Sequence, residues 1–256
     1  MTEQEFSRQI EAMAKKDANK LNFFEKNLLA VAIYSAPLAK KLLEINTNER
    51  FNLYTGKDPI DINIIAADGS RYMYENPVSD VEKQLESFEK AYSRYKALFI
   101  YGLGNGVLLK GILGNLAHRT TVVFEPEIEI IYIVLHLIDF SAEITDSRLV
   151  IFQTDVMEFM DYYRIVGLKD VLSCARLYNL YIISPFYDSY TSDMSLINDN
   201  MTKAFMQHLR IAGNDGTDSM IGVNHTTLHI PDMLESIPAS RIKKQRGKKT
   251  KTAIIV

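Results

Sequence analysis

The chain has 256 residues, of which 47% are hydrophobic and 24% are charged, and its formal net charge is -3. This length suffices for one large α/β domain, or for one domain with an appendage, and the composition is that of an ordinary globular protein. The acidic balance does not favour nucleic acid as a partner, and a single cysteine, Cys174, excludes an internal disulfide and a cysteine-based metal cluster.

The amino terminus alternates charged with apolar residues, whereas a signal peptide has a continuous apolar core. No stretch of the sequence reaches the roughly eighteen consecutive apolar residues that a membrane-spanning helix needs. We therefore expect a cytoplasmic protein that has no membrane partner.

The chain opens with a helical pattern. Apolar residues recur at helical spacing from Phe6 onward, and Pro37 predicts a break in this segment. Two extended stretches rich in β-branched and aromatic residues follow, and the pair Asp68-Gly69 is typical of a tight hairpin turn. Residues 50–75 are therefore predicted to form a small antiparallel unit.

A helix is predicted over residues 79–95 by a stripe of apolar side chains. After Ala97, short apolar strands alternate with helices. The strands are ALFIYG, TTVVFE, RLVIFQ and NLYIIS, and the helices between and after them are VLLKGILGNL, PEIEIIYIVLHLI, DVMEFMDYYRIV and Ser192 to about Ile211. This order predicts an α/β, Rossmann-like fold with a mostly parallel sheet, helices on both faces, and any ligand at the carboxyl ends of the strands.

These patterns divide the chain into three parts. Residues 1–76 hold the helical segment and the small antiparallel unit, and residues 77–238 form the Rossmann-like domain. The end of that domain, GNDGTDSMIGVNHTTLHIPDMLESIPAS, predicts one or two short helices. Residues 239–256 are a basic linker followed by TAIIV, which is typical of the start of another buried strand.

Three glycines follow the first strand of the predicted sheet. Gly102, Gly104 and Gly106 are spaced G-x-G-x-G, which fits S-adenosylmethionine methyltransferases better than dinucleotide enzymes. Glu125 ends the second strand, where an acid can accept hydrogen bonds from ribose hydroxyls, and Asp155 follows the third strand. Together these residues predict a nucleotide pocket, either functional or vestigial.

Each of these residues also has a purely structural interpretation, which stays open at this point. Glycines after a buried strand allow a tight turn into the next helix. Glu125 precedes Pro126, and a carboxylate there suits the first turn of a helix. Asp155 is placed to cap the helix that follows it.

Two further motifs have weaker signals. Ser184-Pro185-Phe186-Tyr187 resembles the Asn/Asp/Ser-Pro-Pro-aromatic motif of amino-methyltransferases, with phenylalanine in place of the second proline. His225 and His229 are four residues apart, but no third ligand is apparent, so we expect no metal site.

The segments YGLGNGVLLKGIL, VVFEPEIEI and TAIIV, with GNDGTDSMIG before the basic run, resemble the motility accessory factor family of bacterial flagellin glycosyltransferases. The resemblance runs along essentially the whole chain. It implies an amino-terminal Rossmann-like domain ahead of a central domain similar to sialyltransferases, with TAIIV as the first strand of that central domain. It also implies transfer of a nonulosonic acid, pseudaminic or legionaminic acid, from a CMP-activated sugar to Ser or Thr of flagellin in the cytoplasm, which flagellar assembly and motility need.

From this resemblance we expect the catalytic central domain to lie beyond Val256, so we assign no catalytic residue and no cofactor to this chain. The chain is then a scaffold or an acceptor-recognition module that has no activity alone. Flagellin is its expected partner, and a second copy of the chain is a further candidate partner. The alternative from a different class is an S-adenosylmethionine-dependent methyltransferase that uses the loop from Gly102 to Gly106.

Overall fold

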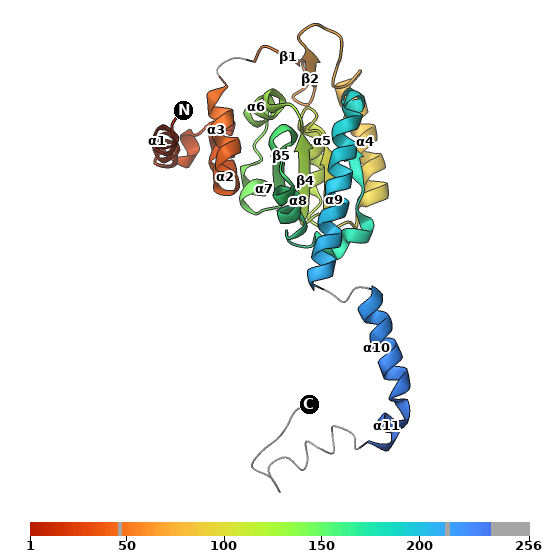
Figure 1. Ribbon diagram of the computed structural model, residues 1–256. Coiled ribbons are helices and arrows are strands. Elements are labelled where there is room, and N and C mark those ends of the chain that lie inside the picture. Colours follow the sequence, from red (N-terminus) through yellow and green to blue (C-terminus); the bar gives the residue numbers. More distant parts are fainter. Residues whose placement is uncertain (46–47, 213–215, 237–256) are drawn as a thin grey trace. The chain divides into compact units, whose positions relative to one another are not determined.

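The computed structural model describes residues 1–45, 48–212 and 216–236 (Figure 1). The chain divides into two compact units, Met1–His208 and Leu209–Val256, and each is described by itself. The first unit contains the opening helices, the small antiparallel unit and the parallel sheet, and their buried apolar side chains form one hydrophobic core. The sequence boundary at residues 76/77 falls inside this unit, at the start of a helix.

The opening segment forms three α-helices, as its apolar spacing predicts. They are α1 (Glu3–Ala14), α2 (Phe23–Tyr34) and α3 (Ala36–Glu44), with the short 3-10 helix η1 (Ala18–Lys20) between the first two. The break expected from Pro37 lies at Ser35, whose side chain caps α3, because proline is accommodated in the first turn of a helix. The structure thus confirms the break and places it two residues earlier.

The small antiparallel unit is also confirmed. Strand β1 (Phe51–Thr55) pairs with β2 (Ile62–Ala66), and Leu53 lies opposite Ile64. Gly69 has a φ of 70°, so the chain turns back at the predicted Asp-Gly pair. After this turn, Tyr72 forms an isolated antiparallel bridge with Ile65 on the second edge of β2.

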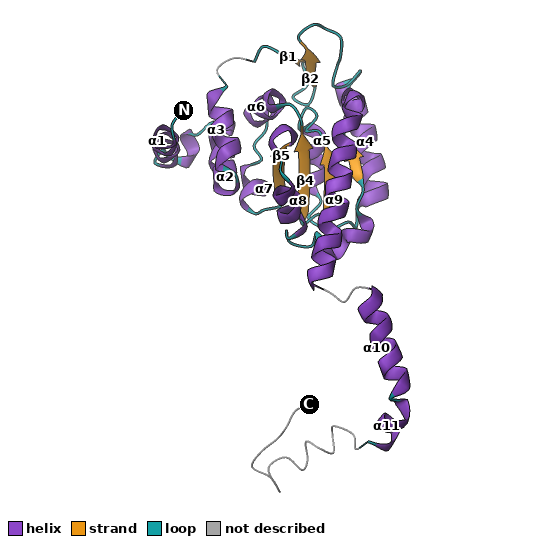
Figure 2. Cartoon of the chain, viewed as in Figure 1, coloured by secondary structure: helices purple, strands orange, loops and turns teal. Residues whose placement is uncertain are grey.

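The main sheet has four parallel strands in the order β5-β4-β3-β6 (Figure 2). Their bounds are β3 (Ala97–Tyr101), β4 (Thr120–Glu125), β5 (Leu149–Gln153) and β6 (Leu180–Ile182). Every residue of β3 and β4 is buried, which explains why apolar side chains do not alternate with exposed polar ones along these strands. The strand order reverses between β3 and β6, and in doubly wound folds ligands bind at this switch point.

Helices cover both faces of the sheet, as predicted. They are α4 (Pro77–Tyr92), α5 (Val107–Gly114), α6 (Ile128–Leu137), α7 (Ser141–Thr145), α8 (Phe159–Val166) and α9 (Thr191–Ala212), with η2 (Thr154–Val156), η3 (Leu172–Leu177) and η4 (Pro185–Tyr190) as 3-10 turns. Phe124 of β4 stacks on Tyr162 of α8, and Phe99 of β3 meets Phe205 of α9, so α8 and α9 share one face. Right-handed crossovers place α5 and α6 on the other face.

One edge of the sheet is closed by the opening helices. The Tyr34 hydroxyl, from α2, donates to the Ile151 carbonyl and accepts from the Ile151 N–H, both at 3.1 Å. Because strand β5 pairs only with β4 in this sheet, these are backbone groups of an edge strand. The tyrosine therefore covers part of an edge that would otherwise be open.

In the second unit the structure describes α10 (Gly216–Leu228) and α11 (Ile230–Glu235), which confirms the short helices predicted before Pro238. The basic run and TAIIV lie outside the described residues, as does the predicted boundary at residues 238/239. No helix in the described part of the chain is long and apolar enough to cross a bilayer.

Candidate functional site

The loop after β3 is built on its three glycines. The φ angles of Gly102, Gly104 and Gly106 are 89°, 60° and 82°, a region that side-chain-bearing residues rarely adopt. Gly106 is also the N-cap residue of α5. The three glycines therefore produce the strand-to-helix turn that the sequence predicts at this place.

The space beside this loop is filled by tyrosine side chains of the same chain. A Cβ added at Gly102 would lie 2.2 Å from a ring carbon of Tyr187, and one added at Gly104 would lie 2.6 Å from the Tyr74 hydroxyl oxygen. Gly104 N–H donates to the Tyr187 hydroxyl at 3.4 Å. The close approach that glycine permits is thus made by protein side chains.

Glu125 meets the loop from the end of β4, and its side chain has no solvent exposure. The carboxylate accepts hydrogen bonds from the Leu103 N–H at 2.8 Å, the Glu127 N–H at 2.9 Å and the Tyr187 hydroxyl at 2.7 Å. Burial is the largest influence and raises the pKa of Glu125 to about 8, although the hydrogen bonds from Glu127, Leu103 and Tyr187 oppose this shift. Both carboxylate oxygens are therefore engaged inside the protein.

Asp155 lies apart from this network. It is exposed in η2, and α8 is capped by Glu158. The expected cap by Asp155 is therefore wrong, because α8 begins four residues later than the apolar pattern from Asp155 predicts. The structure brings Glu125 to the glycine loop and leaves Asp155 on the surface.

The loop after β6 supplies the residue that fills the site. Ser184 donates to the Met73 carbonyl and accepts from the Phe186 N–H, which starts η4 and turns Tyr187 inward. The Tyr187 ring is fully buried and meets Tyr101 edge to face at 5.6 Å. In the sequence Tyr187 belongs to the motif after the fourth strand, but the direction of its side chain depends on the turn after Ser184.

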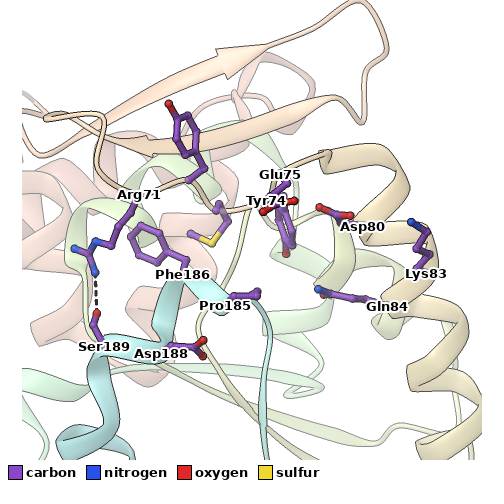
Figure 3. A pocket seen from close by; sticks show the side chains of 12 residues that line it. Arg71, Tyr74, Glu75, Asp80, Lys83, Gln84, Pro185, Phe186, Asp188 and Ser189 are labelled. Carbon is purple, nitrogen blue, oxygen red and sulfur yellow. Dashed lines mark hydrogen bonds between the residues drawn. The ribbon is translucent and has the colours of Figure 1, made fainter.

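An open groove of about 690 Å³ lies next to the filled loop, at the carboxyl end of β6 (Figure 3). Its walls come from residues 71–75, from α4 and from η4. The Arg71 guanidinium lies 4.7 Å from the centre of the Phe186 ring and donates to the Ser189 hydroxyl at 2.9 Å. No sequence motif marks this groove, because η4 follows the other two walls by about a hundred residues in the chain.

Within the described residues, no group of His, Cys, Asp and Glu side chains is placed to hold a metal ion. His225 lies in α10 and His229 precedes α11, with ring centres 6.5 Å apart and both side chains exposed. These two residues belong to the second unit.

The sequence matches no protein-family model and no curated protein. Among solved structures, the chain is similar to a MAf glycosyltransferase from Magnetospirillum magneticum AMB-1, with 14% sequence identity and a TM-score of 0.47. The similarity covers 70% of this chain and 35% of that chain, so this chain spans about a third of the length of that protein.

Proposed function

We propose that this chain is the amino-terminal part of a flagellin glycosyltransferase, and that it serves as a scaffold or recognises the protein acceptor without catalysing transfer alone. The observation that carries the non-catalytic role is the glycine loop filled by Tyr187 and closed by Glu125. The sequence resemblance supplies the role of the complete protein, which is transfer of a nonulosonic acid from a CMP-activated donor to Ser or Thr of flagellin.

The filled loop argues against the methyltransferase alternative. S-Adenosylmethionine would need backbone access at Gly102 and Gly104 and a free acid for its ribose hydroxyls. Here the Tyr187 ring lies against Gly102, and Glu125 already accepts three hydrogen bonds from protein groups. Binding would require the fully buried Tyr187 ring to move out of the loop. The buried Glu125 carboxylate would then lose one hydrogen-bond donor.

Two measurements test the proposal. We expect residues 1–256 to retain purified flagellin in a pull-down and to release no CMP from CMP-activated nonulosonic acids. Release of CMP by this chain alone would contradict the non-catalytic role, and failure to retain flagellin would contradict acceptor recognition.

Calorimetry with S-adenosylmethionine tests the alternative. We expect no binding heat from the wild-type chain. Micromolar binding that Glu125→Gln abolishes, and that the exposed Asp155→Asn control keeps, would replace the proposal with a methyltransferase.

A further inference from the structure

We propose that the groove between residues 71–75 and η4 binds an extended, hydroxyl-bearing peptide segment as an added strand. That flagellin supplies this segment rests on the proposed function, whereas the peptide chemistry is argued from the groove alone.

Tyr72 has an open backbone edge. The Ala66 N–H donates to the Arg71 carbonyl and the Met73 N–H donates to the Ile64 carbonyl, so residues 71 and 73 direct these groups toward β2. Backbone groups of successive residues alternate in direction along an antiparallel strand, so the N–H and C=O of Tyr72 face away from β2. They form no hydrogen bond within the described part of the chain, and Tyr72 lines the groove.

A buried polar atom in the groove wall also lacks a partner. The Gln84 side-chain oxygen, from α4, has no hydrogen-bond partner among the residues that the structure describes, and Gln84 lines the groove (Figure 3). The Tyr74 hydroxyl also lacks a partner, but it lies against Gly104 in the filled loop and not in the groove. A buried polar atom without a partner is unfavourable, so a ligand that donates to the Gln84 oxygen is stabilised here.

A peptide in extended conformation meets these requirements together. Its carbonyl groups accept from the Tyr72 N–H, and its N–H groups donate to the Gln84 oxygen and the Tyr72 carbonyl. Addition of a strand to an open edge is a common mode of peptide recognition. A carbohydrate cannot continue a strand, and the Phe186 ring, a usual stacking surface for a sugar, is already covered by the Arg71 guanidinium.

The charges of the groove indicate which side chains the peptide carries. Glu75, Asp80 and Asp188 line it together with Arg71 and Lys83, so opposite charges nearly balance. Such a lining does not select a strongly charged peptide. The carboxylates are hydrogen-bond acceptors, which suits Ser and Thr hydroxyl donors.

Fluorescence anisotropy with labelled peptides of about twelve residues, tiling the Ser/Thr-rich surface of flagellin, tests this inference on the whole chain. We expect Gln84→Met to weaken binding about three- to tenfold, because it loses one hydrogen bond. Tyr74→Phe is the matched control, since it removes a hydroxyl that lies against Gly104 and not in the groove, and we expect it to bind as the wild type does. Tyr74→Phe deletes an oxygen that has no partner, so the variant should fold normally.

Two further readouts report on strand pairing. The Tyr72 amide should become protected from hydrogen exchange when the peptide binds. A peptide N-methylated at alternate residues keeps its side chains but loses N–H donors, and we expect it not to bind. Protection elsewhere with an unchanged Tyr72 amide, or equal binding of the N-methylated peptide, would overturn the added strand.

The remaining outcomes separate the inference from the proposed function. If flagellin binds and the Gln84→Met variant binds it equally well, the groove assignment is wrong and the proposed function stands. If Ser/Thr-rich peptides of other origin bind through the groove and flagellin does not, the groove stands and the proposed function is wrong. Failure of every peptide to bind at millimolar concentration, or displacement of a bound peptide by sialic acid at similar concentration, would overturn the inference.

Discussion

At the scale of single residues, Glu125 combines two opposing effects. Burial disfavours its charged form, whereas three donors directed at its oxygens favour that form. Burial outweighs the donors, so the folded protein holds a proton on this carboxyl at pH values where an ordinary glutamate is ionised. The stability of the fold should therefore depend on pH through this one group.

Glu125 should contribute a fall in the unfolding free energy as pH rises from about 5 to about 8. Its pKa in the folded chain is about 8 against an ordinary 4.5, so its contribution is complete below pH 4.5 and is lost as pH rises through the folded value. Urea unfolding across this pH range should show a shallower fall for Glu125→Gln than for the wild type.

The control for this measurement is Asp155→Asn, which changes an exposed carboxylate outside the loop network. Its pH dependence should match that of the wild type. An identical slope for the wild type and Glu125→Gln would show that Glu125 does not hold the proton.

At the scale of elements, the loop from Gly102 to Gly106 allows backbone strain and packing to be separated. Gly69 and Gly102 both have positive φ, but a Cβ at Gly69 meets no atom within 4 Å, whereas one at Gly102 overlaps the Tyr187 ring. Gly69→Ala should lower the unfolding free energy by about 1–2 kcal/mol from backbone strain alone. Gly102→Ala should lower it by about 1–3 kcal/mol more, because Tyr187 cannot move aside. Chemical denaturation of both variants measures the difference, and equal losses would mean that the ring does not fill the loop.

The closed edge of the sheet leads to a separate prediction. Tyr34→Phe leaves the N–H and C=O of Ile151, a residue that is 1% exposed, without the hydroxyl that pairs with both. We expect a loss of about 1–3 kcal/mol in thermal or urea unfolding. Tyr54→Phe, which changes a ring that is 53% exposed, should have no measurable effect. A neutral Tyr34→Phe would indicate that solvent replaces the hydroxyl at this edge.

Elements were predictable where burial imposed a clear pattern. The strands β3 and β4 are buried throughout, so β3 is an uninterrupted apolar run and the centre of β4 is the apolar run Val122, Val123 and Phe124. Helix α8 begins later than expected, because residues 154–156 form a 3-10 turn and the helix is capped by Glu158. Helix α7 was not predicted, since its five residues are too few to show a helical period.

At the scale of the whole molecule, the first unit holds the core. Every buried hydrophobic side chain that the structure describes lies between Phe6 and Phe205, and the side chains described in α10 and α11 are exposed. A chain that ends at Ala212 should therefore unfold cooperatively, with a melting temperature within about 2 °C of the complete chain. Calorimetry of both chains checks this, and a large loss would mean that later residues contribute to the core.

The candidate site was only partly predictable at this scale. Three glycines and an acid at the ends of successive strands indicated where the site lies, since parallel strands end at one edge of the sheet. Whether the site is open depends on Tyr187, which arrives from β6 some eighty residues after Gly104 and whose orientation is set by the turn at Ser184. The groove forms only where residues 71–75 pack beside η4, the turn that follows β6. No local sequence pattern predicts this contact.

Tyr187 and Glu125 depend on one another. The tyrosine ring fills the space beside Gly102, and its hydroxyl also donates to the Glu125 carboxylate. A substitution that removes Tyr187 therefore empties this space and at the same time takes one hydrogen-bond donor from a buried acid. Any attempt to engineer a ligand pocket at this loop has to begin by replacing both contributions together.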